Sequence, residues 1–153
     1  MHNGSFPHET GASLELSEPL ETLVDELQQY FRICEEVHAI VRRENQCLKS
    51  ADPHSFHQFQ QSRKDLLDRL TDTQIRLAVH KTSWLRLPAH VRAKKPEVAL
   101  WIRQTLDLIM KTIVLDRENE QLMLRNQMVP ANRLPSVNRQ NPHFVAKLYK
   151  NGR

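Results

Sequence analysis

The chain has 153 residues, enough for one domain of ordinary size, and carries 22 Lys and Arg against 18 Asp and Glu. Its three glycines, Gly4, Gly11 and Gly152, leave the whole stretch from Ala12 to Asn151 without glycine. Phosphate-cradling loops and strand-rich folds use glycine for close approach and tight turns, so nucleotide-binding fingerprints and an all-β fold are excluded.

Membrane insertion and disulfide bonding are also not expected. The longest apolar run, Val98 to Ile102, has five residues, whereas a bilayer span needs roughly 20. The leading residues show no basic segment followed by an apolar one, so a cytoplasmic protein is expected. Cys34 and Cys47 lie thirteen positions apart on one predicted helix, a separation of about 20 Å that favours reduced core thiols.

Residues 18–50 carry a long helical pattern. Ser17 and Pro19 supply a cap and a first-turn residue, which predicts a helix over 18–50 after a flexible N-terminus over 1–17. Further apolar residues beside the main stripe indicate two neighbouring helices. The stripe itself alternates spacings of four and three residues at Leu20, Val24, Leu27, Phe31, Cys34, Val41 and Leu48.

Asp52 and Pro53 predict a sharp reversal, because Asp suits a cap and Pro suits the first turn of a new helix. A second helix over 53–83 would then run antiparallel to the first. Its apolar residues at helical spacing are Phe56, Phe59, Leu66, Leu67, Leu70 and Leu77.

A basic connection follows between Arg76 and Lys95, with six basic residues and no acid. Trp84, Leu85 and Leu87 lie within it. They either close the end of the bundle or form an exposed docking patch. Closure is favoured, because most large apolar side chains are buried.

Pro96 opens a third helical pattern that predicts a helix over 96–128, and Pro130 forbids its continuation. The helical domain then covers 18–128. The expected fold is all-α: an elongated three-helix antiparallel bundle, similar to a coiled-coil hairpin, with disordered N- and C-terminal tails.

Four polar residues interrupt the apolar stripes: His38, Asn45, Asn119 and Asn126. They either fix the register between neighbouring helices or face a wet gap. The sequence leaves both interpretations open.

The segment 129–153 combines three prolines and five basic residues with no acid, a composition typical of a mobile tail. Phe144, Val145, Leu148 and Tyr149 are apolar anchors there without a core to enter. They indicate a docking motif, with folding back onto the bundle as the alternative.

Catalytic motifs do not stand out in the sequence. It has no nucleophile elbow and no HExxH, and His54 and His57 share a first turn without further ligands nearby. We therefore expect a protein that is not an enzyme and that holds no metal and no cofactor.

Three stretches resemble the FlgN family of flagellar export chaperones. The first is ENQCLKSAD at 44–52, followed by Phe56 and by KDLLDRL at 64–70. The second is LDRENEQLML at 115–124, and the third is the ending Tyr149-Lys150-Asn151-Gly152.

The resemblance implies a chaperone that binds the helical ends of hook-associated proteins, prevents their premature association and delivers them to the flagellar type III export gate. The cytoplasmic domain of the gate, and the export ATPase, are the further partners it implies. Client contacts would lie at Leu115, Asn119, Leu122, Met123, Met128 and Val129. Gate docking would fall to Phe144, Leu148, Tyr149, Asn151 and Gly152.

Two other functions remain open from the sequence. A basic helical protein can bind nucleic acid, although the confinement of the charge to 76–95 and 129–153 makes nucleic acid an unexpected partner. The seven-residue spacing of the first helix also suits a scaffold or oligomerisation subunit.

Overall fold

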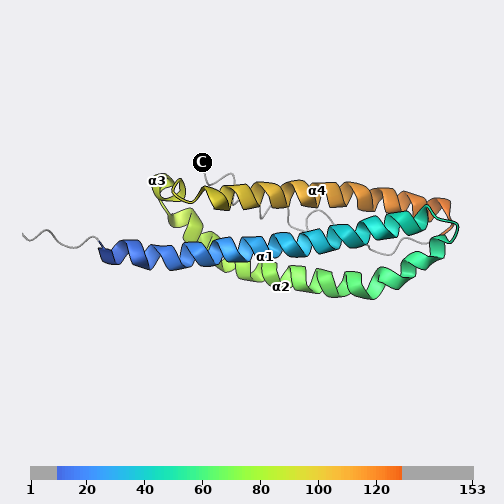
Figure 1. Cartoon of the computed structure of the whole chain (residues 1–153), viewed down its shortest axis with the longest axis horizontal. Coiled ribbons are helices and arrows are strands. Elements are labelled where there is room, and N and C mark those ends of the chain that lie inside the picture. The colour runs from blue at the N-terminus through green and yellow to red at the C-terminus, as the bar shows by residue number, and fades with distance from the viewer. Residues whose placement is uncertain (1–9, 129–153) are drawn as a thin grey trace, which may run out of the picture.

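The computed structural model describes the backbone of residues 10–128 and the side chains of residues 20–128. It contains α1 (Thr10–Leu48), the 3-10 helix η1 (Pro53–Phe59), α2 (Gln60–Arg86), the short α3 (Ala89–Arg92) and α4 (Pro96–Arg125). The three long helices lie side by side in an elongated bundle (Figure 1). All described elements are helical, which confirms the predicted all-α bundle; the predicted tail over 129–153 lies outside the described residues.

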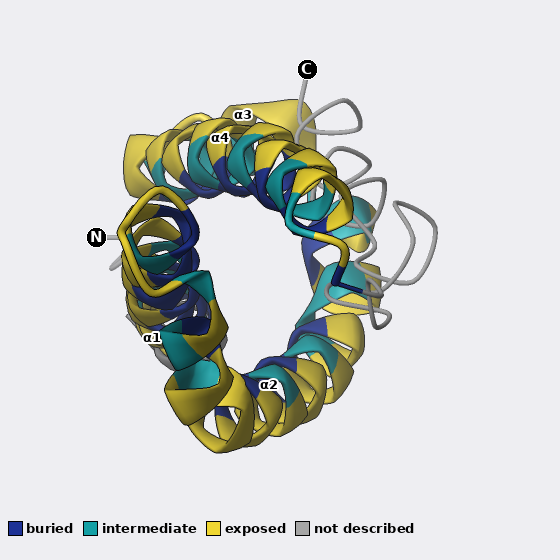
Figure 2. Ribbon diagram, turned by 90° about the vertical axis from the view of Figure 1, so that its right-hand side faces the viewer, coloured by how far each residue is buried: buried dark blue, intermediate teal, exposed yellow. Residues whose placement is uncertain are grey.

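Helix α1 is the element that both other long helices pack against. It runs parallel to α4 and antiparallel to α2, with the turn through η1 at one end and α3 at the other (Figure 1). Viewed along the bundle, the buried residues line the inward faces of all three helices, and the outward faces are exposed (Figure 2). The heptad-like stripe of α1 is therefore covered within the chain.

The observed boundaries of the first two predicted helices differ from the predicted ones. Helix α1 begins at Thr10, so residues 10–17 belong to the helix and the predicted start at 18 is wrong. The reversal at Asp52 and Pro53 is present, but the predicted helix over 53–83 is two elements, η1 and then α2. Helix α2 continues to Arg86 and stops because Leu87 precedes Pro88, which disfavours helical backbone; its ψ is 140°.

Helix α4 ends at Arg125, three residues before the predicted end, and it ends in a Schellman motif. The amide of Gln127 donates to the carbonyl of Leu124 at 3.1 Å, and that of Met128 donates to Met123 at 2.7 Å. Gln127 takes a φ of 57°, the left-handed region usually given to glycine. A local cap, and not Pro130, therefore terminates the helix.

The main core runs along all three long helices and reaches Trp84 at the end that carries α3. Trp84 is 4% exposed, and Leu85 and Leu87 are partly buried against the same core. Of the two interpretations of these residues, closure of the bundle is confirmed. Cys34 lies in the core as a free thiol, and Cys47 is half-buried.

Within residues 10–128, the structure shows no helix whose length and apolar character would let it cross a bilayer.

Candidate functional site

Polar side chains pair across α1 and α4 in a seven-residue rhythm. His38 Nδ1 lies 3.0 Å from Thr112 Oγ1, and Asn45 Nδ2 donates to Asn119 Oδ1 at 2.8 Å. Both pairs are 74 positions apart, so the two helices keep one parallel register. Asn119 also donates to the carbonyl of Val41 at 3.0 Å. These contacts support the register interpretation of the polar interruptions.

Asn126 is the last of these interruptions. Its side-chain amide donates to the carbonyl of Leu122 at 2.8 Å and approaches the carbonyl of Leu48 at 3.4 Å. It therefore ties the end of α4 to the end of α1.

A buried ion cluster joins the three long helices. Arg63 of α2 donates from Nη1 to both carboxylate oxygens of Glu44 on α1, at 2.8 and 3.1 Å, and from Nη2 to Asp116 of α4 at 2.7 Å. The exposed fractions of Arg63, Glu44 and Asp116 are 6%, 1% and 3%. Burial raises the pKa of Asp116 despite the opposing effect of Arg63. Such a cluster specifies one geometry, because each buried charge needs its partner.

The cluster and the neighbouring amide pair form what we call the polar belt: Glu44, Asn45, Arg63, Asp116 and Asn119. Beyond the belt lies a second, smaller apolar cluster, here called the end cluster, made of Leu48, Phe56, Met123 and Met128 with Cys47 and Leu122 beside it. Along α1 and α4 the belt therefore lies between the main core and the end cluster.

The predicted client-binding residues fall on both sides of the belt and mostly point inward. Asn119 is a belt residue, and Met123 and Met128 belong to the end cluster. Late α4 has neighbours within the bundle, because the parallel register places this segment beside Leu48 and η1. Leu115 and Leu122 are half-buried against the main core and the end cluster, and Val129 lies outside the described residues.

The outer face of α4 carries a feature that the sequence pattern did not single out. Met110, Val114 and Leu124 are each more than half exposed on this helix, and Leu100 is nearly so. Of the large apolar side chains on α2, Ile75 and Val79 are comparably exposed. Helix α4 therefore presents apolar surface over most of its length that none of the described residues covers.

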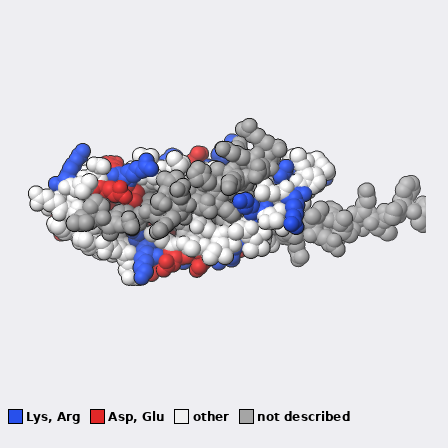
Figure 3. All heavy atoms as spheres, turned by 180° about the vertical axis from the view of Figure 1, so that it is seen from behind, with Lys and Arg blue, Asp and Glu red and all other residues white. Residues whose placement is uncertain are grey.

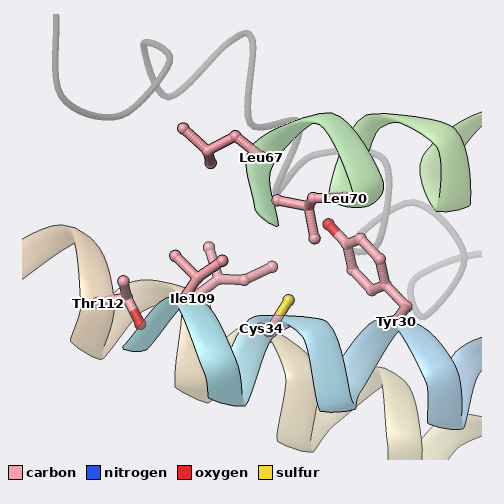
Figure 4. Close-up of a pocket in the computed structure, with 7 residues that line it drawn as sticks. Tyr30, Cys34, Leu67, Leu70, Ile109 and Thr112 are labelled. Atoms are coloured by element: carbon pink, nitrogen blue, oxygen red, sulfur yellow. The ribbon is translucent and has the colours of Figure 1, made fainter. Parts of the chain in front are cut away.

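A small cavity lies where the three long helices meet, between Tyr30 and Cys34 of α1, Leu67 and Leu70 of α2, and Ile109 and Thr112 of α4 (Figure 4). Its volume of about 20 Å³ accommodates about one water molecule and no substrate. Burial raises the pKa of the Cys34 thiol to about 12, which keeps it protonated and unreactive near neutral pH. Gln74 donates to Tyr30 Oη at 3.0 Å.

The remaining candidates do not assemble into a chemical site. The rings of His54 and His57 stack with centroids 6.3 Å apart. In the part of the chain that the structure describes, no group of three or more His, Cys, Asp or Glu is placed to hold a metal ion. The docking set Phe144, Leu148, Tyr149, Asn151 and Gly152 lies outside that part.

The structure thus offers binding surfaces, and their function must be inferred from their own residues. A comparison of the chain with family models, with curated proteins and with solved structures finds no match.

Proposed function

We propose that this protein is an export chaperone of the FlgN type, which binds the helical ends of hook-associated proteins and brings them to the flagellar export gate. The observation that carries the proposal is the apolar face of α4 that no described residue covers, with Met110, Val114 and Leu124 exposed on one helix. Exposed apolar side chains in helical register suit an amphipathic helix from a partner. The resemblance at 44–52, 64–70 and 115–124 supplies the class of partner.

The strength of such a contact suits reversible transport. Burying a large apolar side chain contributes roughly 1.5–3 kcal/mol, and association itself costs several kcal/mol in lost freedom of motion. A few anchors on α4 therefore support binding that a downstream partner can release. The polar belt keeps the binding helix in a fixed register with α1, so the surface is rigid before the client arrives.

The predicted client-binding set enters the proposal in two parts. Leu115 and Leu122 are half-buried and border solvent, so a client helix on α4 can contact them directly. Asn119 is buried in the polar belt, and Met123 and Met128 are buried in the end cluster, so these three contribute only if that end of the bundle opens. Val129 lies outside the described residues. Gate docking in the proposal stays with Phe144, Leu148, Tyr149, Asn151 and Gly152.

A calorimetric titration of the full chain with a peptide from the terminal helix of a hook-associated protein of the same organism tests the proposal. We expect saturable one-to-one binding, and no binding of a scrambled peptide of equal composition. Absence of binding to every hook-associated helix would refute the chaperone function. The same titration with the cytoplasmic domain of the export gate tests the second half of the proposal.

A further inference from the structure

At the end of the bundle that carries α3, two buried donors and three cations have no partner among the described residues. No Asp or Glu occurs between residues 73 and 96. The indole Nε1 of Trp84 and the Nε of Arg92 are buried with no hydrogen-bond partner among the described residues. A buried donor without a partner is destabilising, so this end of the molecule would gain from a partner that brings acceptors.

The distribution of charged residues also differs between the two ends of the molecule. Figure 3 shows Lys and Arg without neighbouring Asp or Glu at the α3 end of the face in view, whereas both signs occur at the other end. Arg86, Lys94 and Lys95 have no ion-pair partner among residues 20–128. Lys49 and Arg69, nearer the other end, are paired with Glu118 and Glu36.

An amphipathic pocket that includes Arg86 opens between the first described side chains of α1 and the end of α2. Its volume is about 320 Å³, which is space for one or two large side chains. Apolar walls and polar groups both contribute to its lining, which consists of Leu20, Leu23, His80, Ser83, Trp84, Arg86 and Leu87. None of the described residues that line it carries a carboxylate, so its polar groups are suited to accept a negatively charged guest.

We propose that this pocket, here called the Trp84 pocket, is a second docking site that takes an acidic peptide segment with a large apolar side chain. The apolar side chain enters between Leu23, Trp84 and Leu87. Neighbouring carboxylates of the peptide meet Arg86 and the cations of the α3 segment, and a carboxylate or carbonyl supplies the acceptor that Trp84 Nε1 lacks once the ring turns towards it. This site is separate from the outer face of α4 and does not depend on the chaperone function.

The apolar pocket distinguishes a peptide from a nucleic acid. A phosphate backbone binds through the cations alone, and it gains nothing from contact with the leucine side chains of the cavity. A peptide with an apolar anchor uses both features, because the anchor fills the cavity while the acids remain at the rim. The observations therefore favour a peptide.

The test uses the full chain and a fluorescein-labelled peptide of Glu residues with a central Leu-Phe pair, followed by anisotropy. A second peptide carries Ser-Ser in place of Leu-Phe. We expect saturable binding of the first peptide, weakened about five-fold or more by Arg86→Gln, since the charge contact of Arg86 with a peptide carboxylate is lost. Arg117→Gln removes the same charge from the exposed outer face of α4 and should leave the affinity unchanged.

An amide correlation spectrum gives an independent readout at the site. The chain has two tryptophans, so Trp84→Phe identifies the indole signal of Trp84. The Leu-Phe peptide should move that signal downfield and leave the Trp101 signal in place.

Several results would overturn the proposal. They are absence of binding, equal affinity for the Ser-Ser peptide, an equal loss with Arg117→Gln, or a Trp84 signal that does not move. Single-stranded DNA that binds more tightly than the peptide, with the same dependence on Arg86, would assign the basic end to nucleic acid. Circular dichroism melting of each variant shows that the bundle is intact.

Discussion

Arg63 is the side chain at which the three long helices meet. Its two terminal nitrogens bind carboxylates from α1 and α4, while its own backbone belongs to α2. Charged residues are rarely this buried, and composition alone gives no reason to place this arginine, or Glu44 and Asp116, in the interior. The ion cluster could not be predicted because its members pair only after the helices have packed.

Removing the arginine should be far more damaging than removing one acid. Arg63→Met leaves two buried carboxylates without a cation, and we expect a loss of about 3–5 kcal/mol in the free energy of unfolding, measured with urea. Asp116→Asn keeps an oxygen for Arg63 Nη2. It removes a carboxyl group whose pKa is already raised by burial. The variant should therefore lower the free energy of unfolding by only about 1 kcal/mol. Equal losses in the two variants would show that the cluster does not act as a unit.

Gln127 occupies a backbone position that a glycine would hold at lower cost. A side chain in the left-handed region costs roughly 1–2 kcal/mol. We expect Gln127→Gly to raise the free energy of unfolding by about 1 kcal/mol. Gln121→Gly, at an exposed position inside α4, is the matched control and should lower it by about 1 kcal/mol. Thermal melting of the parent and both variants measures these differences in stability. A Gln127→Gly variant that is less stable than the parent would contradict the assignment of the cap.

At the scale of whole helices, the periodicity of apolar residues predicts where helices form, but not how they pair. The stripes of α1, the reversal at Asp52 and Pro53, and the opening of α4 at Pro96 follow from apolar spacing and from proline in the first turn. Neither η1 nor α4 has a side-chain cap hydrogen bond at its start. The pairing of His38 with Thr112 and of Asn45 with Asn119 does not follow from spacing, because a helical stripe does not say which neighbour it faces.

The outer face of α4 was missed for a related reason. Met110 and Val114 are apolar, and an apolar side chain in a helix is by default assigned to the core. Their exposure becomes visible only when the register with α1 is known, since that register decides which face of α4 is inward. The pattern of α4 alone could not separate a core stripe from a binding stripe.

Acid should lower the stability of the folded chain through His38. Thr112 Oγ1 donates to the carbonyl of Leu108 at 2.8 Å, so its oxygen accepts from His38 Nδ1. Burial first, and then Arg42 and Lys111, lower the pKa of His38 below 6.5. The folded chain therefore binds the proton less well than the unfolded chain. The stability that neutral His38 contributes is fully present above pH 6.5 and is lost as the pH falls through the folded pKa.

Comparison with His38→Gln isolates this effect from the other histidines. Urea unfolding at about pH 8 and about pH 5 should show a larger loss of stability on acidification in the parent than in the variant. Parallel losses in the two chains would mean that His38 does not sense pH.

At the scale of the molecule, the candidate binding surfaces lie at different places along the three-helix bundle. The polar belt and the end cluster lie at the end with η1, the Trp84 pocket at the end with α3, and the outer face of α4 runs between them. A fixed bundle with an uncovered apolar helix is suited to holding a client helix. The central claim is therefore that a client binds on α4 and not on the other exposed helix faces.

The most direct test of that claim compares the same substitution at two exposed valines. Val114 on α4 and Val79 on α2 are 64% and 71% exposed, so Asp at either position should leave the bundle folded. The account predicts that Val114→Asp weakens calorimetric binding of the hook-associated helix by about ten-fold or more, and that Val79→Asp leaves it unchanged. Undiminished binding by Val114→Asp, or an equal loss with Val79→Asp, would contradict it.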